Sequence, residues 1–328
     1  MKKILLVDAD SKIPNLALMK LSSFHKQCGN DVEVRKLKYA GYPHNKNVTV
    51  IDASQFDEVA VSIIFTPNKN KVIVNGCEHV EFGGTGYDLT VSLPTDIDEL
   101  DEDYSIYPEH NASYGFITRG CIRNCWFCFV PEKEGNLKYY RDWHRIAKHK
   151  EVYFMDNNFL AYDKHKKVLS ELAENKVKCQ FNQGLDIRLL DDENAELLSK
   201  LRYIKEYYFA FDSSKYEKII ERGVQIFKKY VPNDWRMKMF IYAHPSMSVE
   251  DVLYRIEWCR DRKIIPYLMR DKSCWSDKNR FFYVDLAAYC NQPKLFKNMS
   301  FEEYIFKRHP KNIDRAENSF SVYSKGIV

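Results

Sequence analysis

The sequence lacks long apolar runs. None of its hydrophobic stretches reaches the roughly 18 uninterrupted apolar residues that a membrane-spanning helix needs. Residues 4–7 are apolar, but Asp8 and Asp10 interrupt this run well before it reaches the length of a signal-peptide core. We therefore expect a first β-strand here, no membrane contact and a cytoplasmic location.

The sequence also has little net charge. Its 50 Lys and Arg residues are balanced by 46 Asp and Glu residues, and the net charge of +4 is too small to indicate a nucleic-acid partner by itself. Hydrophobic residues make up 45% of the 328 residues, which is enough apolar surface for a folded core and argues against disorder. The composition predicts a globular protein of one large or two smaller domains.

Cysteines in disulfide-like patterns are missing as well. The nine Cys are an odd number, and cytoplasmic thiols are kept reduced, so a disulfide framework is not expected. Three of the nine fall within eight residues. The other six are scattered and are expected as small buried side chains; they are Cys28, Cys77, Cys179, Cys259, Cys274 and Cys290.

The first 95 residues show one pattern of elements. Apolar strand patterns alternate around one helical pattern, and this order predicts a small, parallel, Rossmann-like sheet for residues 1–95. The acidic residues 96–103 predict an exposed linker within residues 96–112. Strands are expected at residues 3–7, 32–37, 58–65 and 71–74, and the helix at residues 14–26.

A second pattern begins near Tyr114, where strand and helix patterns alternate at intervals of about one strand-plus-helix unit. Six such units predict a partial (β/α)6 barrel of the TIM type over residues 113–270. Residues 271–328 are expected to form a short helical extension. The whole chain is therefore expected to have an α/β fold. The six strands are expected to begin near Tyr114, Val152, Lys178, Tyr207, Met237 and Ile264.

The segment after the first barrel strand contains the main chemical motif, C-x3-C-x2-C, at Cys121, Cys125 and Cys128. Three soft thiolates this close together bind a soft or borderline metal centre, and the short spacings let one loop supply three ligands. No fourth ligand is present locally, so one position of the metal centre would stay open, which is a catalytic arrangement. The loop also lies at the strand end where barrel enzymes place their active sites.

The alternative is a structural zinc site. The same three cysteines with His110 or His144 would supply four ligands, and the protein would then be a non-catalytic, nucleic-acid-binding module. Zinc ribbons usually combine two CxxC pairs, and the sequence has no second pair. Basic segments at residues 141–150 and 236–238 favour nucleic acid mildly, with a solvated helix face as the other interpretation.

The string RGCIRNCWFC at residues 119–128 resembles the radical S-adenosylmethionine (radical SAM) superfamily, in the branch that includes cobalamin-dependent and methylthiotransferase enzymes. With residues 15–18 and the glycine-rich loop at 83–88, it resembles members from phages and gut bacteria with a cobalamin-binding-like first domain. This resemblance implies that the three cysteines hold a [4Fe–4S] cluster, whose fourth iron binds the amino and carboxylate groups of SAM. An electron donor of the flavodoxin or ferredoxin type would trigger cleavage of SAM to a 5′-deoxyadenosyl radical, which abstracts hydrogen from an unidentified substrate.

The resemblance also implies SAM contacts at strand ends. Asp156 stands where the family often has Gly-Gly-Glu, and would accept a hydrogen bond from the SAM ammonium group; a turn without a ligand role is the alternative. Phe127 would contact adenine or would serve packing only. Arg188 would bind a carboxylate, or would pair with Asp186 or Asp191. The candidate cofactor-binding residues are Phe127, Asp156, Asn157, Asn158, Gln183, Arg188, Asp212 and Tyr242.

Two features of related enzymes are missing from the first 95 residues. Cobalamin-binding relatives carry D-x-H-x-x-G, and the nearest match at residues 10–15 lacks both His and Gly. Methylthiotransferases carry three further cysteines in their first domain, whereas this segment has only Cys28 and Cys77. We expect neither a lower-ligand cobalamin site nor a second cluster, and we expect the loop at residues 83–86 to be a turn.

Overall fold

The computed structural model describes residues 1–37 and 47–326. The chain forms two compact units, which are treated separately. The first comprises Met1–Phe116, Arg123–Asn136 and Arg141–Glu151; the second comprises Ile117–Ile122, Leu137–Tyr140 and Val152–Val328. None of the described helices is long and apolar enough to cross a membrane. Residues 327–328 of the expected C-terminal extension lie outside the described residues.

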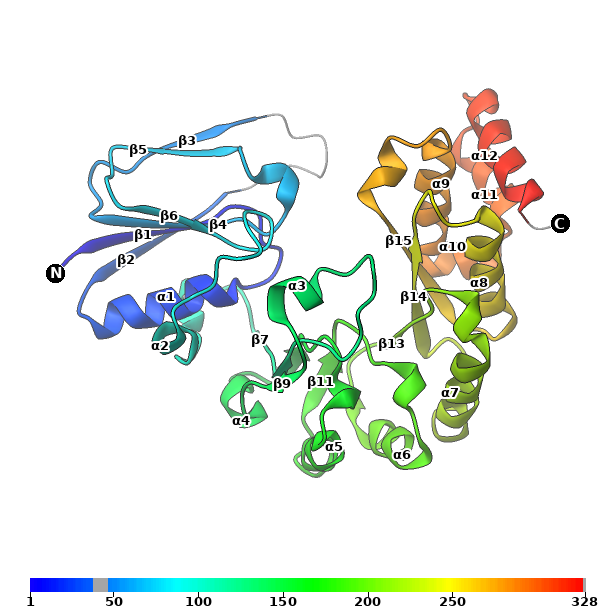
Figure 1. Ribbon diagram of the computed structural model, residues 1–328, viewed down its shortest axis with the longest axis horizontal. Coiled ribbons are helices and arrows are strands. Elements are labelled where there is room, and N and C mark those ends of the chain that lie inside the picture. Colours follow the sequence, from blue (N-terminus) through cyan, green and yellow to red (C-terminus); the bar gives the residue numbers. More distant parts are fainter. Residues whose placement is uncertain (38–46, 327–328) are drawn as a thin grey trace. The chain divides into compact units, whose positions relative to one another are not determined.

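A parallel sheet with the strand order β2-β1-β4-β6 forms the centre of the first unit (Figure 1). Helix α1 (Leu16–Gln27) connects β1 to β2, and the Asn15 side chain caps it by accepting a hydrogen bond from the Leu18 N–H. Because the apolar run at the start of the chain is a strand, the expectation for residues 3–7 is confirmed. The strands are β1 (Lys3–Asp8), β2 (Asp31–Lys36), β4 (Glu58–Ser62) and β6 (Val80–Gly83).

Both faces of this sheet are covered, which explains why residues 4–7 of β1 are all apolar. Successive side chains of a strand point to opposite faces. Leu6 therefore packs with Leu18 of α1, while Leu5 packs in a second cluster with Ile51 and Val72. These last two residues belong to β3 (Thr49–Asp52) and β5 (Val72–Asn75), which form a two-stranded parallel sheet of their own among the described residues.

The strand expected at residues 71–74 is thus real, but it does not join the main sheet. The edge of that sheet is taken by β6, which the sequence analysis did not predict. A four-residue strand with the sequence VEFG is too short to give a clear alternation of apolar and polar residues.

The acidic residues 96–103, expected as an exposed linker, pack against α1 within the first unit. Helix α2 (Thr95–Asp98) brings Asp98 Oδ1 to 2.8 Å from Lys20 Nζ. Asp103 Oδ2 accepts hydrogen bonds from Ser22 Oγ at 2.6 Å and from Lys26 Nζ at 2.7 Å. Burial opposes the charged form of Asp103, but hydrogen bonds from Lys26, Ser105 and Ser22 lower its pKa to about 2.

The basic residues at 141–150 are the partners of this acidic segment. The Arg141 side chain is buried, and its Nη1 lies 3.1 Å from Glu102 Oε1. Arg145 and Lys148 both pair with Asp101, at 2.6 and 3.1 Å. These cations, which mildly favoured nucleic acid in the sequence, are engaged by acids of their own unit.

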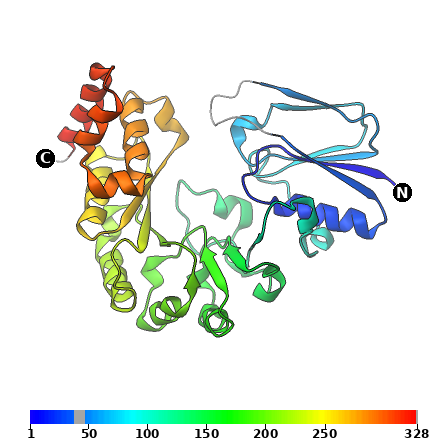
Figure 2. The same cartoon turned by 180° about the vertical axis from the view of Figure 1, so that it is seen from behind.

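Strands and helices alternate through the second unit, as expected for residues after 152 (Figures 1 and 2). Neighbouring strands β11 and β12, β13 and β14, and β14 and β15 all pair in parallel. The α/β class with parallel strands is therefore confirmed. The strands are β10 (Glu151–Phe154), β11 (Lys178–Phe181), β12 (Arg202–Tyr203), β13 (Tyr207–Ala210), β14 (Met237–Ala243) and β15 (Ile265–Arg270).

The intervening helices lie along the outside of these strands, as both views show (Figures 1 and 2). Two short strands, β8 (Thr118–Arg119) and β9 (Lys138–Tyr139), form an antiparallel pair beside the cysteine loop. Strand β7 (Ala112–Gly115) belongs to the first unit. The helices are α5 (His165–Glu174), α6 (Asp192–Lys200), α7 (Glu217–Tyr230) and α8 (Val249–Asp261).

The chain after β15 is helical and is fastened by one buried carboxylate. Asp285 of α9 is fully buried, and it accepts hydrogen bonds from His309 Nε2, Arg315 Nη2 and Ser319 Oγ at 3.0 Å each. Arg308 Nε lies 3.1 Å from the same carboxylate. A buried charge with this many donors is well compensated. The helices are α9 (Arg280–Cys290), α10 (Pro293–Asn298), α11 (Phe301–Arg308) and α12 (Ile313–Lys325).

Candidate functional site

The three motif cysteines lie on the loop between β8 and α3 (Val130–Glu134), and all of them reach solvent. Cys121 and Cys125 are half-buried and Cys128 is exposed. The loop contains one tight turn, in which the Cys128 N–H donates to the Cys125 carbonyl oxygen at 2.9 Å. An accessible loop is a suitable place for thiolate ligands.

The scattered cysteines differ from the motif cysteines and among themselves. Cys179, Cys259, Cys274 and Cys290 are buried as expected. Burial raises the pKa of the Cys179 thiol to about 12, so it stays protonated and inert. The expectation is wrong for Cys28, which is exposed, and for Cys77, which is half-buried. Cys28 ends α1 as its C-cap, where the chain turns at the surface.

The donor set fits an iron–sulfur cluster in its chemistry. Within residues 1–37 and 47–326, no three His, Cys, Asp or Glu side chains are gathered closely enough to hold a metal ion. Three thiolates on one short accessible loop are nevertheless the ligands that such clusters use. Binding would therefore require the three thiols to converge.

Asp156 was expected to contact SAM. In the structure its carboxylate is hydrogen-bonded to β8 and the residue before it, the segment that leads into the cysteine loop. Its Oδ1 accepts hydrogen bonds from Thr118 N at 2.6 Å and Thr118 Oγ1 at 2.7 Å, and its Oδ2 accepts one from Ile117 N at 3.2 Å. Burial raises the pKa of the carboxyl to about 6, although these hydrogen bonds oppose the shift. Asp156 is fully buried, so it positions β8 and is not open to a ligand in this conformation.

Asn158 lies next to the first cysteine and has an unused acceptor. Its Nδ2 contacts Cys121 Sγ at 3.6 Å and Asp186 Oδ2 at 3.3 Å. Its Oδ1 is buried and has no hydrogen-bond partner in the described part of the chain. The side chain makes no capping hydrogen bond to the turn that follows. A buried unpaired amide oxygen costs about 1–3 kcal/mol, which a hydrogen-bond donor on a ligand would offset.

Arg188 forms the intramolecular pair that the sequence analysis kept open as an alternative. Its Nε lies 2.7 Å from Asp186 Oδ1, and its Nη2 lies 3.1 Å from Asp186 Oδ2. Asp186 thus contacts both Arg188 and Asn158, whereas the sequence analysis named it only as a possible partner of Arg188. Gln183 is exposed and Asn157 is half-buried.

Asp212 and Tyr242 are coupled at the ends of β13 and β14. Asp212 Oδ1 accepts a hydrogen bond from the Tyr242 N–H at 3.2 Å. Burial raises the pKa of Asp212 to about 6, against the opposing charge of Arg255. The Tyr242 hydroxyl donates to Asp271 Oδ2 at 2.7 Å. Burial opposes the charged form of Asp271, but hydrogen bonds from Ser273 and Tyr242 lower its pKa to about 2.

Arg255 of α8 joins these strand ends, and the sequence analysis missed it. Its side chain is fully buried. Nη1 donates to the Phe211 carbonyl at 2.9 Å and to the Tyr242 carbonyl at 3.2 Å, and Nε donates to Asp251 Oδ2 at 2.8 Å. An arginine four residues after an aspartate on a mostly apolar helix face was the available signal.

Aromatic rings cover one face of the sheet formed by β13, β14 and β15. The Tyr208 and Phe240 rings pack edge to face at 5.4 Å, and the Phe240 and Tyr267 rings do so at 5.7 Å. In β11, the Gln180 side chain is buried and neither of its amide atoms has a partner among the described residues. Phe127 is half-buried and packs edge to face against Trp126 at 5.6 Å.

The fold has a solved counterpart. It is similar to the structure of the cobalamin-dependent S-adenosylmethionine radical enzyme OxsB with aqua-cobalamin bound, with a TM-score of 0.51 and 12% sequence identity. The likeness covers 90% of this chain and 56% of that chain, so this protein spans little more than half of the OxsB length. No protein-family model and no curated protein matches the sequence. At this identity the likeness shows the fold alone.

Residues 10–15, where the cobalamin motif is missing, serve the local fold. Asp10 accepts hydrogen bonds from Ile64 N at 2.8 Å, Phe65 N at 3.0 Å and Asn68 Nδ2 at 2.8 Å. The glycine-rich loop packs against residues 64–65, whose N–H groups donate hydrogen bonds to Asp10. A Cβ on Gly86 would lie 2.5 Å from the Phe65 backbone. The glycines therefore allow close approach to the chain's own backbone.

Proposed function

We propose that this protein is a radical SAM enzyme whose Cys121, Cys125 and Cys128 hold a [4Fe–4S] cluster. A reduced cluster held there would supply the electron that cleaves SAM into methionine and a 5′-deoxyadenosyl radical, and this radical would abstract hydrogen from an unidentified substrate. The observation that carries the proposal is the C-x3-C-x2-C loop in a fold like that of a radical SAM enzyme. A flavodoxin- or ferredoxin-type electron donor in the cytoplasm belongs to the same proposal.

The proposal includes a finer domain reading. Residues 1–95 are the Rossmann-like domain, residues 96–112 the connection, residues 113–270 the partial (β/α)6 barrel and residues 271–328 the helical extension. The alternating strands and helices from β10 to β15 support the barrel. In the first unit, one helix between β1 and β2 and parallel pairing support the Rossmann-like reading.

The strand ends suit a cationic, amino-bearing ligand such as SAM. Three carboxylates follow β11, β13 and β15, namely those of Asp186, Asp212 and Asp271. Asn158 adds an acceptor beside Cys121, and we assign it the SAM ammonium group. Asp156 holds the base of the loop and so positions Cys121.

The remaining candidates receive their roles from the same proposal. Arg188 would bind the SAM carboxylate by exchanging Asp186 for it, since one guanidinium binds one carboxylate bidentately. Phe127 would contact adenine, and Asn157, Gln183 and Tyr242 would contact the ribose or the methionine part. We base these assignments on the positions of the residues, which lie in the cysteine loop or at the ends of strands.

The test is cluster reconstitution without oxygen. Purified protein supplied with iron and sulfide should turn brown with a broad absorbance near ~400 nm, and with reductant and SAM it should release 5′-deoxyadenosine. Cys125→Ala should lose iron and reduce this release by at least about 100-fold, because one of three cluster ligands is gone. Cys77→Ala is the matched control, since Cys77 is also half-buried but lies outside the loop.

The opposite result is equally clear. A colourless protein that holds one tightly bound zinc, and that releases no 5′-deoxyadenosine, would overturn the proposal. It would support the alternative of a non-catalytic, zinc-stabilised nucleic-acid-binding module.

A further inference from the structure

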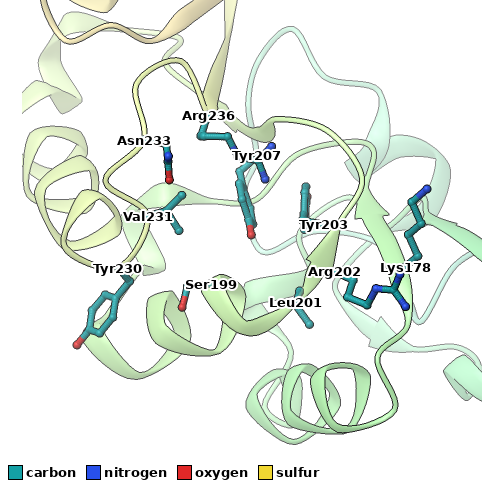
Figure 3. Close-up of a pocket in the computed structure, with 10 residues that line it drawn as sticks. All are labelled: Lys178, Ser199, Leu201, Arg202, Tyr203, Tyr207, Tyr230, Val231, Asn233 and Arg236. Atoms are coloured by element: carbon teal, nitrogen blue, oxygen red, sulfur yellow. The ribbon is translucent and has the colours of Figure 1, made fainter.

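A hollow of about 430 Å³ opens at the amino ends of the strands of the second unit (Figure 3). Lys178 begins β11, Arg202 begins β12 and Arg236 directly precedes β14, while the ends of α6 and α7 supply the opposite wall. The proposed SAM contacts follow the carboxyl ends of these strands. A four-residue strand separates the two ends by roughly 13 Å, so the hollow is a separate site.

The hollow is lined by cations and by no acidic residue. Its charged lining residues are Lys178, Arg202 and Arg236. Within residues 1–37 and 47–326, neither arginine has a carboxylate at ion-pair distance, and neither donates a side-chain hydrogen bond to a carbonyl at the ends of α6 or α7. The two guanidinium groups therefore do not serve as helix caps.

Two stacked tyrosines give the hollow a preformed wall. The Tyr203 and Tyr207 rings are 3.8 Å apart and 18° from parallel. Tyr203 Oη accepts a hydrogen bond from Phe181 N at 3.0 Å, and the Tyr207 hydroxyl donates to the Leu198 carbonyl at 2.9 Å. The Arg236 guanidinium lies over the Tyr207 ring at 5.6 Å. Since both hydroxyls already form hydrogen bonds within the protein, the guanidinium groups of Arg202 and Arg236 are the groups that we expect to bind a ligand.

The cations nearby are mostly paired, so they do not extend the hollow into a basic track. Lys200 pairs with Glu196 at 2.7 Å, and Lys263 pairs with Asp234 at 2.8 Å. Lys229 pairs with Asp192. A nucleic-acid strand needs basic side chains along several successive phosphates, whereas the positive charge here is concentrated in one hollow.

We propose that this hollow binds a phosphate ester of a small organic molecule, about the size of a mononucleotide. Arginine guanidinium groups match the geometry of phosphate oxygens and bind them bidentately. The volume falls within the range of small-molecule sites and exceeds what a lone phosphate ion requires. The assignment does not depend on the cluster or on SAM.

The test is to titrate the full chain with uridine 5′-monophosphate and to measure binding by isothermal titration calorimetry. Uridine is chosen because it lacks the adenine of SAM. We expect binding of uridine 5′-monophosphate, weaker binding of inorganic phosphate and no binding of uridine. Arg202→Gln should weaken binding about tenfold or more, and Arg202→Gln with Arg236→Gln should abolish it, since each charged hydrogen-bond donor removed contributes to affinity. Lys200→Gln is the matched control, because Lys200 is an exposed cation of α6 outside the hollow, and it should bind normally.

Three results would overturn the proposal. They are no binding of uridine 5′-monophosphate by the wild-type chain at millimolar concentration, unchanged binding by Arg202→Gln, and binding confined to a single-stranded oligothymidylate. Arg202 is exposed, so this variant should fold; an unchanged melting temperature of Arg202→Gln checks that the loss is one of binding.

Discussion

At the carboxyl ends of the strands in the second unit, four carboxylates are engaged by groups of their own unit; at the amino ends, two arginines face a hollow without an acidic partner. The carboxylates accept hydrogen bonds from backbone N–H groups, hydroxyls and guanidinium groups. They are Asp156, Asp186, Asp212 and Asp271.

The difference shows how the unit distributes its electrostatic interactions. At the carboxyl ends, hydrogen bonds within the unit hold the four carboxylates in place. At the amino ends, Arg202 and Arg236 keep their charge free of carboxylates in the described residues, which is the property of a surface that binds an anion. Four predictions test this contrast.

The largest effect is expected at Arg255, the buried guanidinium that joins the ends of β13 and β14. Arg255→Met leaves the carbonyls of Phe211 and Tyr242 without their donor and leaves Asp251 without its cation. We expect the free energy of unfolding to fall by about 3–5 kcal/mol, measured by urea denaturation. Arg222→Met, at an exposed position of α7, should change it by less than about 0.5 kcal/mol. Equal losses in both variants would contradict the structural role of Arg255.

The second effect is a change in the free energy of unfolding with pH, caused by the carboxyl group of Asp156. Its pKa is raised from 3.8 to about 6 in the folded protein, so between these values the folded form holds a proton that the unfolded form releases. The contribution of Asp156 to stability is therefore full below about pH 4 and falls by up to about 3 kcal/mol as the pH rises to about 6.

Asp156→Asn removes this titration. Urea denaturation at pH 4, 5, 6 and 7 should show that the difference in unfolding free energy between wild type and variant changes over this range and is constant above it. Asp212, whose pKa is also raised to about 6, remains in both proteins and cancels in the difference. A difference that does not vary with pH would show that Asp156 is already ionised at pH 4.

The third effect concerns the unpaired oxygen of Asn158. If it binds the ammonium group of SAM, Asn158→Leu should weaken SAM binding to the reconstituted protein about tenfold, the loss of one hydrogen bond to a charged group. Equilibrium dialysis with labelled SAM measures this. Asn175→Ala, at the exposed end of α5, is the control. Unchanged affinity in Asn158→Leu would assign the ammonium contact to another residue.

The smallest effect is expected at the amino ends. Arg202→Gln should change the unfolding free energy by less than about 0.5 kcal/mol, because the exposed guanidinium has no carboxylate partner within the described residues. Thermal denaturation in the absence of ligand measures this. A loss comparable to that of Arg255→Met would mean that both ends are structural and would remove the contrast.

Local patterns in the sequence predicted the elements that depend on neighbouring residues. The strand and helix positions after residue 152 follow from the change between two-residue and 3.6-residue periodicity. Ser300 and Glu303 have the spacing of a capping box, and both of its hydrogen bonds form because they lie within one turn. The cysteine motif was readable because its chemistry lies in eight consecutive residues.

Contacts between distant residues were settled only by the tertiary structure. Asp156 lies after the end of β10, as the sequence predicted. Its carboxylate, however, accepts hydrogen bonds from the N–H groups of residues 117 and 118. Arg141, predicted as part of a basic surface, is buried against Glu102. In both cases the residue type allows several hydrogen-bond or ion-pair partners. The partner that is found is the one buried with it in the folded structure.

What the sequence determined by itself is the α/β alternation of elements and a loop of three cysteines, because periodicity and spacing are properties of adjacent residues. What the tertiary structure decided is which polar groups are satisfied internally and which face solvent or a hollow. That division depends on burial and on the pairing of residues far apart in the chain, since a charged or polar side chain behaves differently once it is withdrawn from water.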